Sequence, residues 1–156
     1  MTAGLRPILL VEDSPKDLEL TLAALARCKL ANPVEVARDG AEALDFLYGR
    51  GAWLQRPSGD PAVVLLDLKL PKIDGLEVLE RVKADASLKQ IPVVMLTASR
   101  EEQDLVRSYQ LGVNAFVVKP VAFADFLQAI QDLGMFWGVV NEPPPRSGTK
   151  SGETSR

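Results

Sequence analysis

The sequence predicts an α/β fold in which a doubly wound parallel sheet lies between helices, written (βα)5 because strand and helix patterns alternate five times. Continuous apolar runs at 7–11, 63–66 and 91–96 are typical of strands that are buried on both faces, as in parallel sheets. The segments between them carry apolar residues at steps of three and four, which indicates amphipathic helices. At 156 residues, the chain fits one domain of ordinary size.

The composition argues against several classes of protein. A formal net charge of -3 gives no signal for nucleic-acid binding, and no apolar run approaches the ~20 residues of a membrane span. The single cysteine, Cys28, cannot form an internal disulfide, and the opening residues lack the pattern of a signal peptide. We therefore expect a cytoplasmic protein. Histidine is absent, so any histidine in the mechanism belongs to a partner.

The first half of the chain is predicted to form two strand–helix units. The strand at 7–11 ends in the adjacent acids Glu12 and Asp13. Ser14 then opens a helix as its N-cap, with proline at the first helical position and an acid in the first turn. A short strand over 34–37 and a second helix follow.

Residues 49–61 are predicted to form an irregular but ordered surface loop, because glycines and prolines interrupt them repeatedly. The loop contains Trp53, which could pack locally or contact a partner. We favour local packing, since amphipathic rings are often only partly buried.

Asp67 ends the central apolar strand, and we interpret it as the centre of the function. In open α/β sheets, ligands bind just outside the carboxyl ends of the strands, so an acid in this position is more often chemical than structural. The alternative is that Asp67 caps a helix. Asp74 is better placed for that role, because Pro71 and Gly75 separate Asp67 from the next amphipathic segment.

Two further units complete the predicted sheet. A helix is expected between residues 74 and 86, and the strand at 91–96 ends at Thr97. The next helix is predicted over 101–111 with Gly112 as its C-terminal stop. Its apolar side is expected to carry Leu105, Val106 and Tyr109.

The fifth strand is predicted at 114–118 and is followed directly by Lys119. The last helix carries an apolar stripe over 123–137, whose part beyond Gly134 exceeds what the sheet requires and is interpreted as a surface for another subunit. The Pro-rich, polar stretch 141–156 has the composition of a flexible tail. The folded domain is therefore predicted to span 1–140.

The predicted strand ends share one edge of the sheet, where polar side chains gather. These are Glu12, Asp13, Asp67, Thr97 and Lys119. Three carboxylates so close together repel one another, and a hard divalent cation with oxygen ligands, Mg²⁺, would relieve that repulsion. With metal and lysine neutralising the equatorial oxygens, Asp67 could attack phosphorus while Thr97 donates a hydrogen bond.

Four segments together resemble the receiver domain of bacterial two-component response regulators, over roughly Pro7 to Gly138. They are 8–13 (ILLVED), 65–75 (LLDLKLPKIDG), 93–98 (VVMLTA) and 115–120 (AFVVKP). The resemblance implies a flavodoxin-like strand order 2-1-3-4-5. It also implies that Asp67 accepts a phosphoryl group from a phosphohistidine on a sensor histidine kinase.

The resemblance further implies a role for each site residue. Mg²⁺ would be held by Asp13, Asp67 and the backbone carbonyl of Lys69, with Glu12 acting through water. The phosphoryl oxygens would be engaged by Thr97 and Lys119, and the Lys119–Pro120 peptide bond would be cis. Phe116 matches the family's switch aromatic, which turns inward as the threonine moves; here it lacks a tyrosine hydroxyl.

Two features are similar to stand-alone regulators that partner bacterial phytochromes: the long loop around Trp53 and the ending at 134–137. This narrower resemblance implies a bacteriophytochrome as the kinase and no DNA-binding output. It also implies a homodimer formed through the fourth helix, fifth strand and fifth helix.

Two other functions remain open from the residues alone. An aspartyl-nucleophile phosphohydrolase would share the nucleophile but needs a second acid two positions later, where this chain has Lys69. A pure interaction module would keep the acids as a vestigial site. A nucleotide-binding domain is disfavoured, because neither a G-x-G-x-x-G motif nor a P-loop follows any strand.

We expect Lys69 and Ser99 to flank the path of attacking water and to influence the phosphoryl lifetime.

Overall fold

The structure is a computed structural model that describes residues 6–54, 59–113 and 115–133. Its strands are β1 (Ile8–Val11), β2 (Val34–Ala37), β3 (Val63–Asp67), β4 (Val93–Thr97) and β5 (Ala115–Val118). Its helices are α1 (Pro15–Arg27), α2 (Gly40–Tyr48), the short 3₁₀ helix η1 (Gly51–Trp53), α3 (Gly75–Ala84), α4 (Arg100–Ser108) and α5 (Phe123–Asp132).

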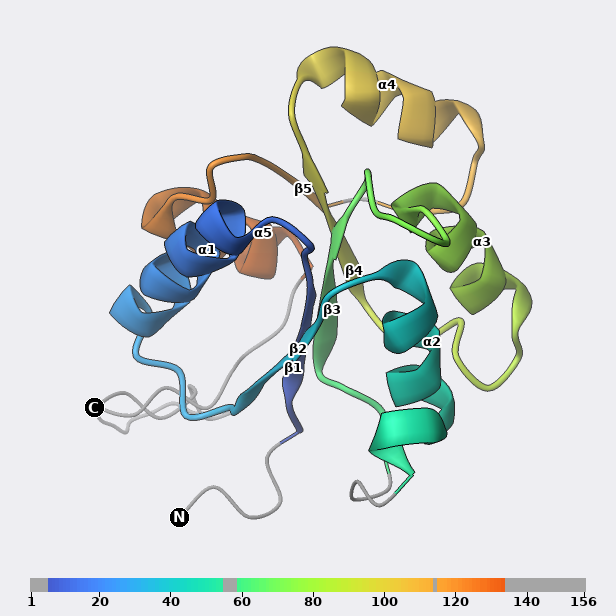
Figure 1. Ribbon diagram of the computed structural model, residues 1–156. Coiled ribbons are helices and arrows are strands. Elements are labelled where there is room, and N and C mark those ends of the chain that lie inside the picture. Colours follow the sequence, from blue (N-terminus) through green and yellow to red (C-terminus); the bar gives the residue numbers. More distant parts are fainter. Residues whose placement is uncertain (1–5, 55–58, 114, 134–156) are drawn as a thin grey trace, which may run out of the picture.

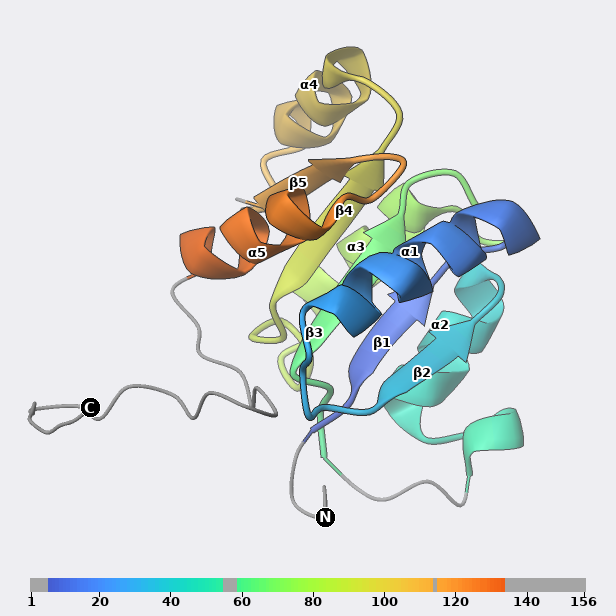
Figure 2. The same cartoon turned by 90° about the vertical axis from the view of Figure 1, so that its left-hand side faces the viewer.

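The strands pair in parallel in the order β2-β1-β3-β4-β5, so the predicted fold class and strand order are confirmed. Helices α1 and α5 cover one face of the sheet, and α2, α3 and α4 lie on the other (Figures 1 and 2). β3 lies between β1 and β4, and all five of its residues are buried. The last residue of this central strand is Asp67, which the register places beside Leu96 of β4.

Four helices begin with the polar cap that their sequence predicts or permits. The Ser14 hydroxyl accepts from the backbone N–H of Asp17 at 3.3 Å at the start of α1. Asp74 caps α3 in the same way, accepting from the N–H of Glu77 at 2.9 Å, which confirms the prediction that Asp74 rather than Asp67 is the cap. The other two side-chain caps are Asp39 on α2 and Ser99 on α4. Each satisfies a backbone donor that the first helical turn leaves unpaired.

The predicted bounds of α4 are wrong at its C-terminal end. The helix stops at Ser108 rather than Leu111, because the backbone turns left-handed at Gln110 (φ 54°), two residues before the predicted stop at Gly112. Its predicted apolar side is also only partly buried. Val106 is buried, whereas Leu105 and Tyr109 remain 48% and 47% exposed.

The loop before β3 is more regular than predicted, since residues 51–53 form η1. Trp53 is half-buried there and packs its ring edge-on against Phe46 of α2, with centroids 4.9 Å apart, which confirms local packing. Expectations for Asn114, for 134–137 and for the tail at 141–156 fall outside the described residues. Over the ranges that are described, none of the helices has the length and hydrophobicity needed to cross a membrane.

Gly75 allows α3 to begin directly against the end of β3. Its backbone N–H donates to the carbonyl of Leu68 at 2.8 Å, and a Cβ at this position would overlap the carbonyl oxygen of Asp67. Because backbone atoms on both sides cannot yield cheaply, we expect Gly75→Ala to lower the free energy of unfolding by about 2–3 kcal/mol. Urea denaturation measures this, with Glu80→Ala on the exposed side of α3 as control. Equal stability of the two variants would contradict the close approach.

Candidate functional site

The site centres on Asp67, whose side chain lies at the carboxyl end of β3 and is nearly buried, at 4% exposure. Its Oδ2 accepts from the Lys119 ammonium at 3.0 Å, and its Oδ1 lies 3.4 Å from the backbone N–H of Lys69. The carboxylate is therefore held from two sides. At this end of the sheet the carboxylate lies beside Glu12 and Asp13, which follow β1, and Lys119, which follows β5.

Glu12 and Asp13 follow β1 and bring two more carboxylates to this position. One oxygen from each of Glu12, Asp13 and Asp67 lies within 4.8 Å of the others. Glu12 is fully buried, whereas Asp13 is exposed. A cluster of carboxylate oxygens with one exposed member fits a hard cation that keeps part of its water shell, as Mg²⁺ does.

Lys119 is the cation that the structure places among these acids. Its Nζ lies 3.0 Å from Asp67 Oδ2, 3.0 Å from Asp17 Oδ2 and 3.3 Å from Glu12 Oε1. Its peptide bond to Pro120 is cis, as the resemblance implied. Asp17 is a site residue that the sequence analysis predicts only as an acid in the first turn of the helix that became α1. Its place one turn after the Glu12–Asp13 pair was the available signal.

Thr97 is the last residue of β4, whereas Phe116 lies within β5 beside Met95, and the two make different contacts. The Thr97 carbonyl accepts from the backbone N–H of Lys119 at 2.8 Å, which ties the ends of β4 and β5 together. The Thr97 hydroxyl, fully buried, accepts from Gln103 Nε2 of α4 at 3.4 Å. Phe116 is half-buried on β5, and the Arg107 guanidinium lies 4.4 Å from its ring centroid. Sequence reasoning missed Gln103 and Arg107 as partners of these residues.

Lys69 and Ser99, expected to flank the site, both connect to Glu102 of α4. The Lys69 ammonium pairs with Glu102 at 3.4 Å and is otherwise largely exposed. Ser99 accepts from the Glu102 backbone N–H, and the Glu102 carboxylate accepts in turn from the N–H of Ala98 at 2.7 Å. The loop after Asp67 and the start of α4 are thus linked beside the acids.

Burial and neighbouring charges shift the pKa values of Glu12 and Lys119. Burial, together with the charge of Asp67 and a hydrogen bond to it, raises the pKa of Glu12 to about 7. The Ser14 N–H and the Lys119 charge lower it by less. Burial lowers the pKa of Lys119, but its hydrogen bonds to Asp67 and Asp17, together with the charges of Asp67 and Glu12, raise it overall.

In EDTA, we expect the free energy of unfolding to fall as the pH rises from about 4.5 to above 7. The folded-state pKa of Glu12, about 7, lies above its ordinary value of 4.5, so the folded protein holds this proton more tightly than the unfolded chain. That stabilisation is complete below the ordinary pKa and is lost as the pH rises through the raised one. Urea denaturation across this range measures the slope, which Glu12→Gln should flatten. An unchanged slope in Glu12→Gln would contradict the assignment.

An open parallel sheet with acids, a lysine and a threonine at the ends of β1, β3, β4 and β5 is an α/β domain with its polar site at the carboxyl edge of the sheet. The sequence profile described as "Response regulator receiver domain" matches residues 8–131, and the chain belongs to this family. The chain is therefore a signalling phosphoacceptor rather than a catalytic enzyme such as a phosphohydrolase.

Solved structures provide more specific similarity. The bacteriophytochrome response regulator AtBRR is 72% identical, with a TM-score of 0.85 over 89% of this chain and 99% of that one. The bacteriophytochrome response regulator RtBRR is 64% identical, with a TM-score of 0.85 over 90% of this chain and 85% of that one. The Mn(2+)-bound form of response regulator Rcp1, a protein of Synechocystis sp., is 39% identical, with a TM-score of 0.67 over 89% and 99% of the two chains.

Proposed function

We propose that this protein is a single-domain response regulator that accepts a phosphoryl group on Asp67 from a phosphohistidine of a sensor histidine kinase. The observation that carries the proposal is the Asp67 carboxylate itself, nearly buried at the end of the central strand and held 3.0 Å from the Lys119 ammonium beside two further acids. The regulator's folded part would span 1–140, with 141–156 as its tail.

In the proposed transfer, an oxygen of Asp67 forms a bond to phosphorus while the bond from phosphorus to the histidine nitrogen breaks. The electron pair of that bond stays on the imidazole of the kinase. Lys119 faces the negative charge on the transferred group, and the Thr97 hydroxyl donates a hydrogen bond to a phosphoryl oxygen. Phe116 then changes its position with Thr97, which alters the surface formed by α4 and β5.

The residues present fit Mg²⁺ as the metal of this site. Asp13, Asp67 and the backbone carbonyl of Lys69 would hold it, with Glu12 acting through water. When bound, Mg²⁺ supplies positive charge that neutralises the carboxylates and the phosphoryl oxygens. The oxygen-only donor set supports this choice, as does the Mn(2+)-bound form of the related Rcp1.

The similarity to AtBRR and RtBRR supports a bacteriophytochrome as the kinase, and we propose that the protein acts in the cytoplasm. We propose a homodimer formed through α4, β5 and α5. Two exposed side chains support that surface: Tyr109, directly after α4, and Val118 of β5, each more than 40% exposed. Sedimentation measures the oligomeric state, and a monomer at high protein concentration would contradict the dimer.

Incubation with acetyl phosphate tests phosphoryl acceptance without knowledge of the kinase. With Mg²⁺, intact-mass spectrometry should show the addition of one phosphoryl group, and EDTA should suppress it. A protein that remains unlabelled with Mg²⁺ would contradict the proposed function. Transfer from a phosphorylated bacteriophytochrome, compared with transfer from an unrelated sensor kinase, then tests the proposed partner.

A further inference from the structure

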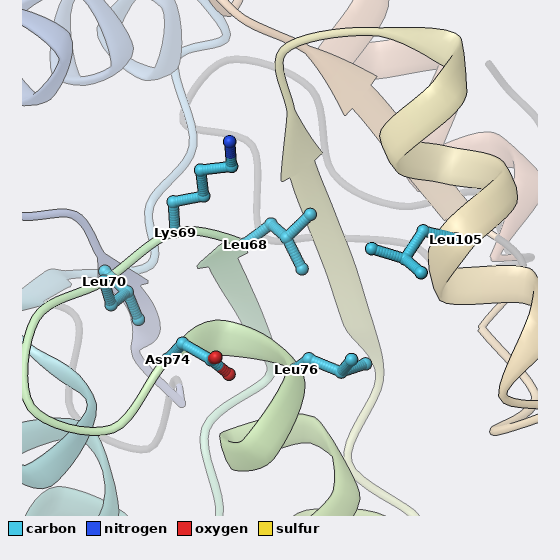
Figure 3. Close-up of a pocket in the computed structure, with 6 residues that line it drawn as sticks. All are labelled: Leu68, Lys69, Leu70, Asp74, Leu76 and Leu105. Carbon is cyan, nitrogen blue, oxygen red and sulfur yellow. The ribbon is translucent and has the colours of Figure 1, made fainter.

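Helix α4 is attached to the rest of the fold by few buried side chains. Among its nine residues, Val106 is the one that is buried. Between α4, the loop after β3 and the start of α3 lies an open pocket of about 330 Å³, lined by Leu68, Lys69, Leu70, Asp74, Leu76 and Leu105. Leu105 points from α4 across this pocket toward the leucines of the opposite wall (Figure 3). The helix is therefore not closely packed on that side and has room to shift.

Two side chains one turn apart on α4 contact the two residues proposed to switch. Gln103 donates to the Thr97 hydroxyl, and Arg107 stacks its guanidinium over the Phe116 ring. Positions four apart lie on the same side of a helix, so one placement of α4 makes both contacts. We call Gln103 and Arg107 the α4 clasp.

We propose that the α4 clasp holds Thr97 and Phe116 in their unphosphorylated arrangement, so that Gln103 and Arg107 act as positioning residues that set how readily the protein switches. This inference rests on the proposed phosphoacceptor function. It adds two residues whose contacts must be lost or rearranged when Thr97 and Phe116 move.

The contacts that Gln103 and Arg107 make with Thr97 and Phe116 are weak enough to be lost when the protein switches. The hydrogen bond from Gln103 to Thr97 is long, at 3.4 Å, and joins two neutral groups. A phosphoryl oxygen on Asp67 would offer the Thr97 hydroxyl a charged acceptor, and charge-assisted hydrogen bonds are shorter and stronger. Because the hydroxyl accepts from Gln103 and would donate to the phosphoryl oxygen, the two bonds compete only through the movement of Thr97, which takes its hydroxyl away from Gln103. The cation–π contact of Arg107 opposes displacement of Phe116, and it would be weaker for an uncharged side chain.

Each clasp residue has a variant that removes its contact while keeping its length. Gln103→Met removes the amide donor, and Arg107→Met removes the cation. Arg107 also pairs with Asp104 at 3.7 Å, so Asp104→Asn serves as the matched control: it removes this surface ion pair and leaves the Phe116 contact in place. Gln103 is half-buried and Arg107 is exposed, and thermal unfolding verifies that each variant folds. Gln103→Asn, which withdraws the same donor by one carbon, provides a second test of that contact.

Nuclear magnetic resonance of the Thr97 methyl group and the Phe116 ring measures the switch directly. Wild-type protein in EDTA defines one end of the scale, and wild-type protein with Mg²⁺ and beryllium fluoride, a stand-in for the phosphoryl group, defines the other. Without fluoride, the signals of Gln103→Met and Arg107→Met should move toward the fluoride-bound end, and their labelling by acetyl phosphate should be several-fold faster. The signals of Asp104→Asn should stay with the wild type.

Folded Gln103→Met and Arg107→Met proteins whose signals coincide with those of the wild type would overturn the clasp while leaving the proposed function intact. Signals that shift equally in Asp104→Asn would also overturn it, because a surface ion pair would then explain the effect. If beryllium fluoride and Mg²⁺ change nothing in the wild type, the proposed function fails together with the clasp.

Discussion

Replacing Asp67 by asparagine should abolish phosphorylation by acetyl phosphate and by the kinase. The carboxamide has nearly the same shape and can still accept from Lys119, but it lacks the anionic oxygen that attacks phosphorus. The fold should survive, because the change removes one of three mutually repelling carboxylates. Intact-mass spectrometry in the presence of Mg²⁺ should therefore show no phosphoryl addition in a protein that unfolds at least as cooperatively as the wild type.

Asp85→Asn is the matched control for this experiment. Asp85 follows α3 and binds Ser87 and Tyr48, away from the carboxylates at the ends of β1 and β3. Its variant should be labelled like the wild type. If Asp67→Asn were labelled to the same extent as Asp85→Asn, another residue would be the acceptor, and the central assignment would be wrong.

The strands and the polar edge could be predicted because their determinants are local in the sequence. An apolar run such as 63–66 is compatible with burial on both faces, and parallel strands place the residues that follow them at one edge. This is why Asp67 is expected beside the Glu12–Asp13 pair, although more than 50 residues separate them. The caps Ser14 and Asp74 were also local, since each stands directly before its helix.

The side-chain contacts that the sequence does not predict depend on how the helices are oriented against the sheet. The pairing of Asp17 with Lys119 requires the orientation of α1, and the contact of Gln103 with Thr97 requires that of α4. Neither orientation is encoded in a local pattern. The end of α4 was missed because Gly112 is the usual left-handed residue, whereas here Gln110 takes that conformation first. Leu105 follows the apolar period of α4, yet it borders an open pocket rather than the core.

Lys119→Met should destabilise the protein strongly, and by an amount that depends on Mg²⁺. Without the ammonium, Glu12, Asp17 and Asp67 lose their shared cation in a nearly buried setting. Removing one partner of a fully buried ion pair costs about 3–5 kcal/mol. We expect roughly 2–3 kcal/mol in EDTA at pH 8, because the lysine side chain keeps 17% exposure. In addition, loss of the Lys119 charge raises the pKa of Glu12 further, so that uptake of a proton relieves part of the repulsion.

Saturating Mg²⁺ should restore part of this loss, since the remaining carboxylates still offer oxygen ligands to a cation. Labelling by acetyl phosphate should be slower than in the wild type, because nothing replaces the ammonium beside the transferred group. Urea denaturation with and without Mg²⁺ measures the first effect, and Lys89→Met, at an exposed position before β4, is the control, expected within about 0.5 kcal/mol of the wild type. A loss of equal size in EDTA and in Mg²⁺ would mean that Lys119 stabilises the fold by packing alone rather than as the counter-ion of the acids.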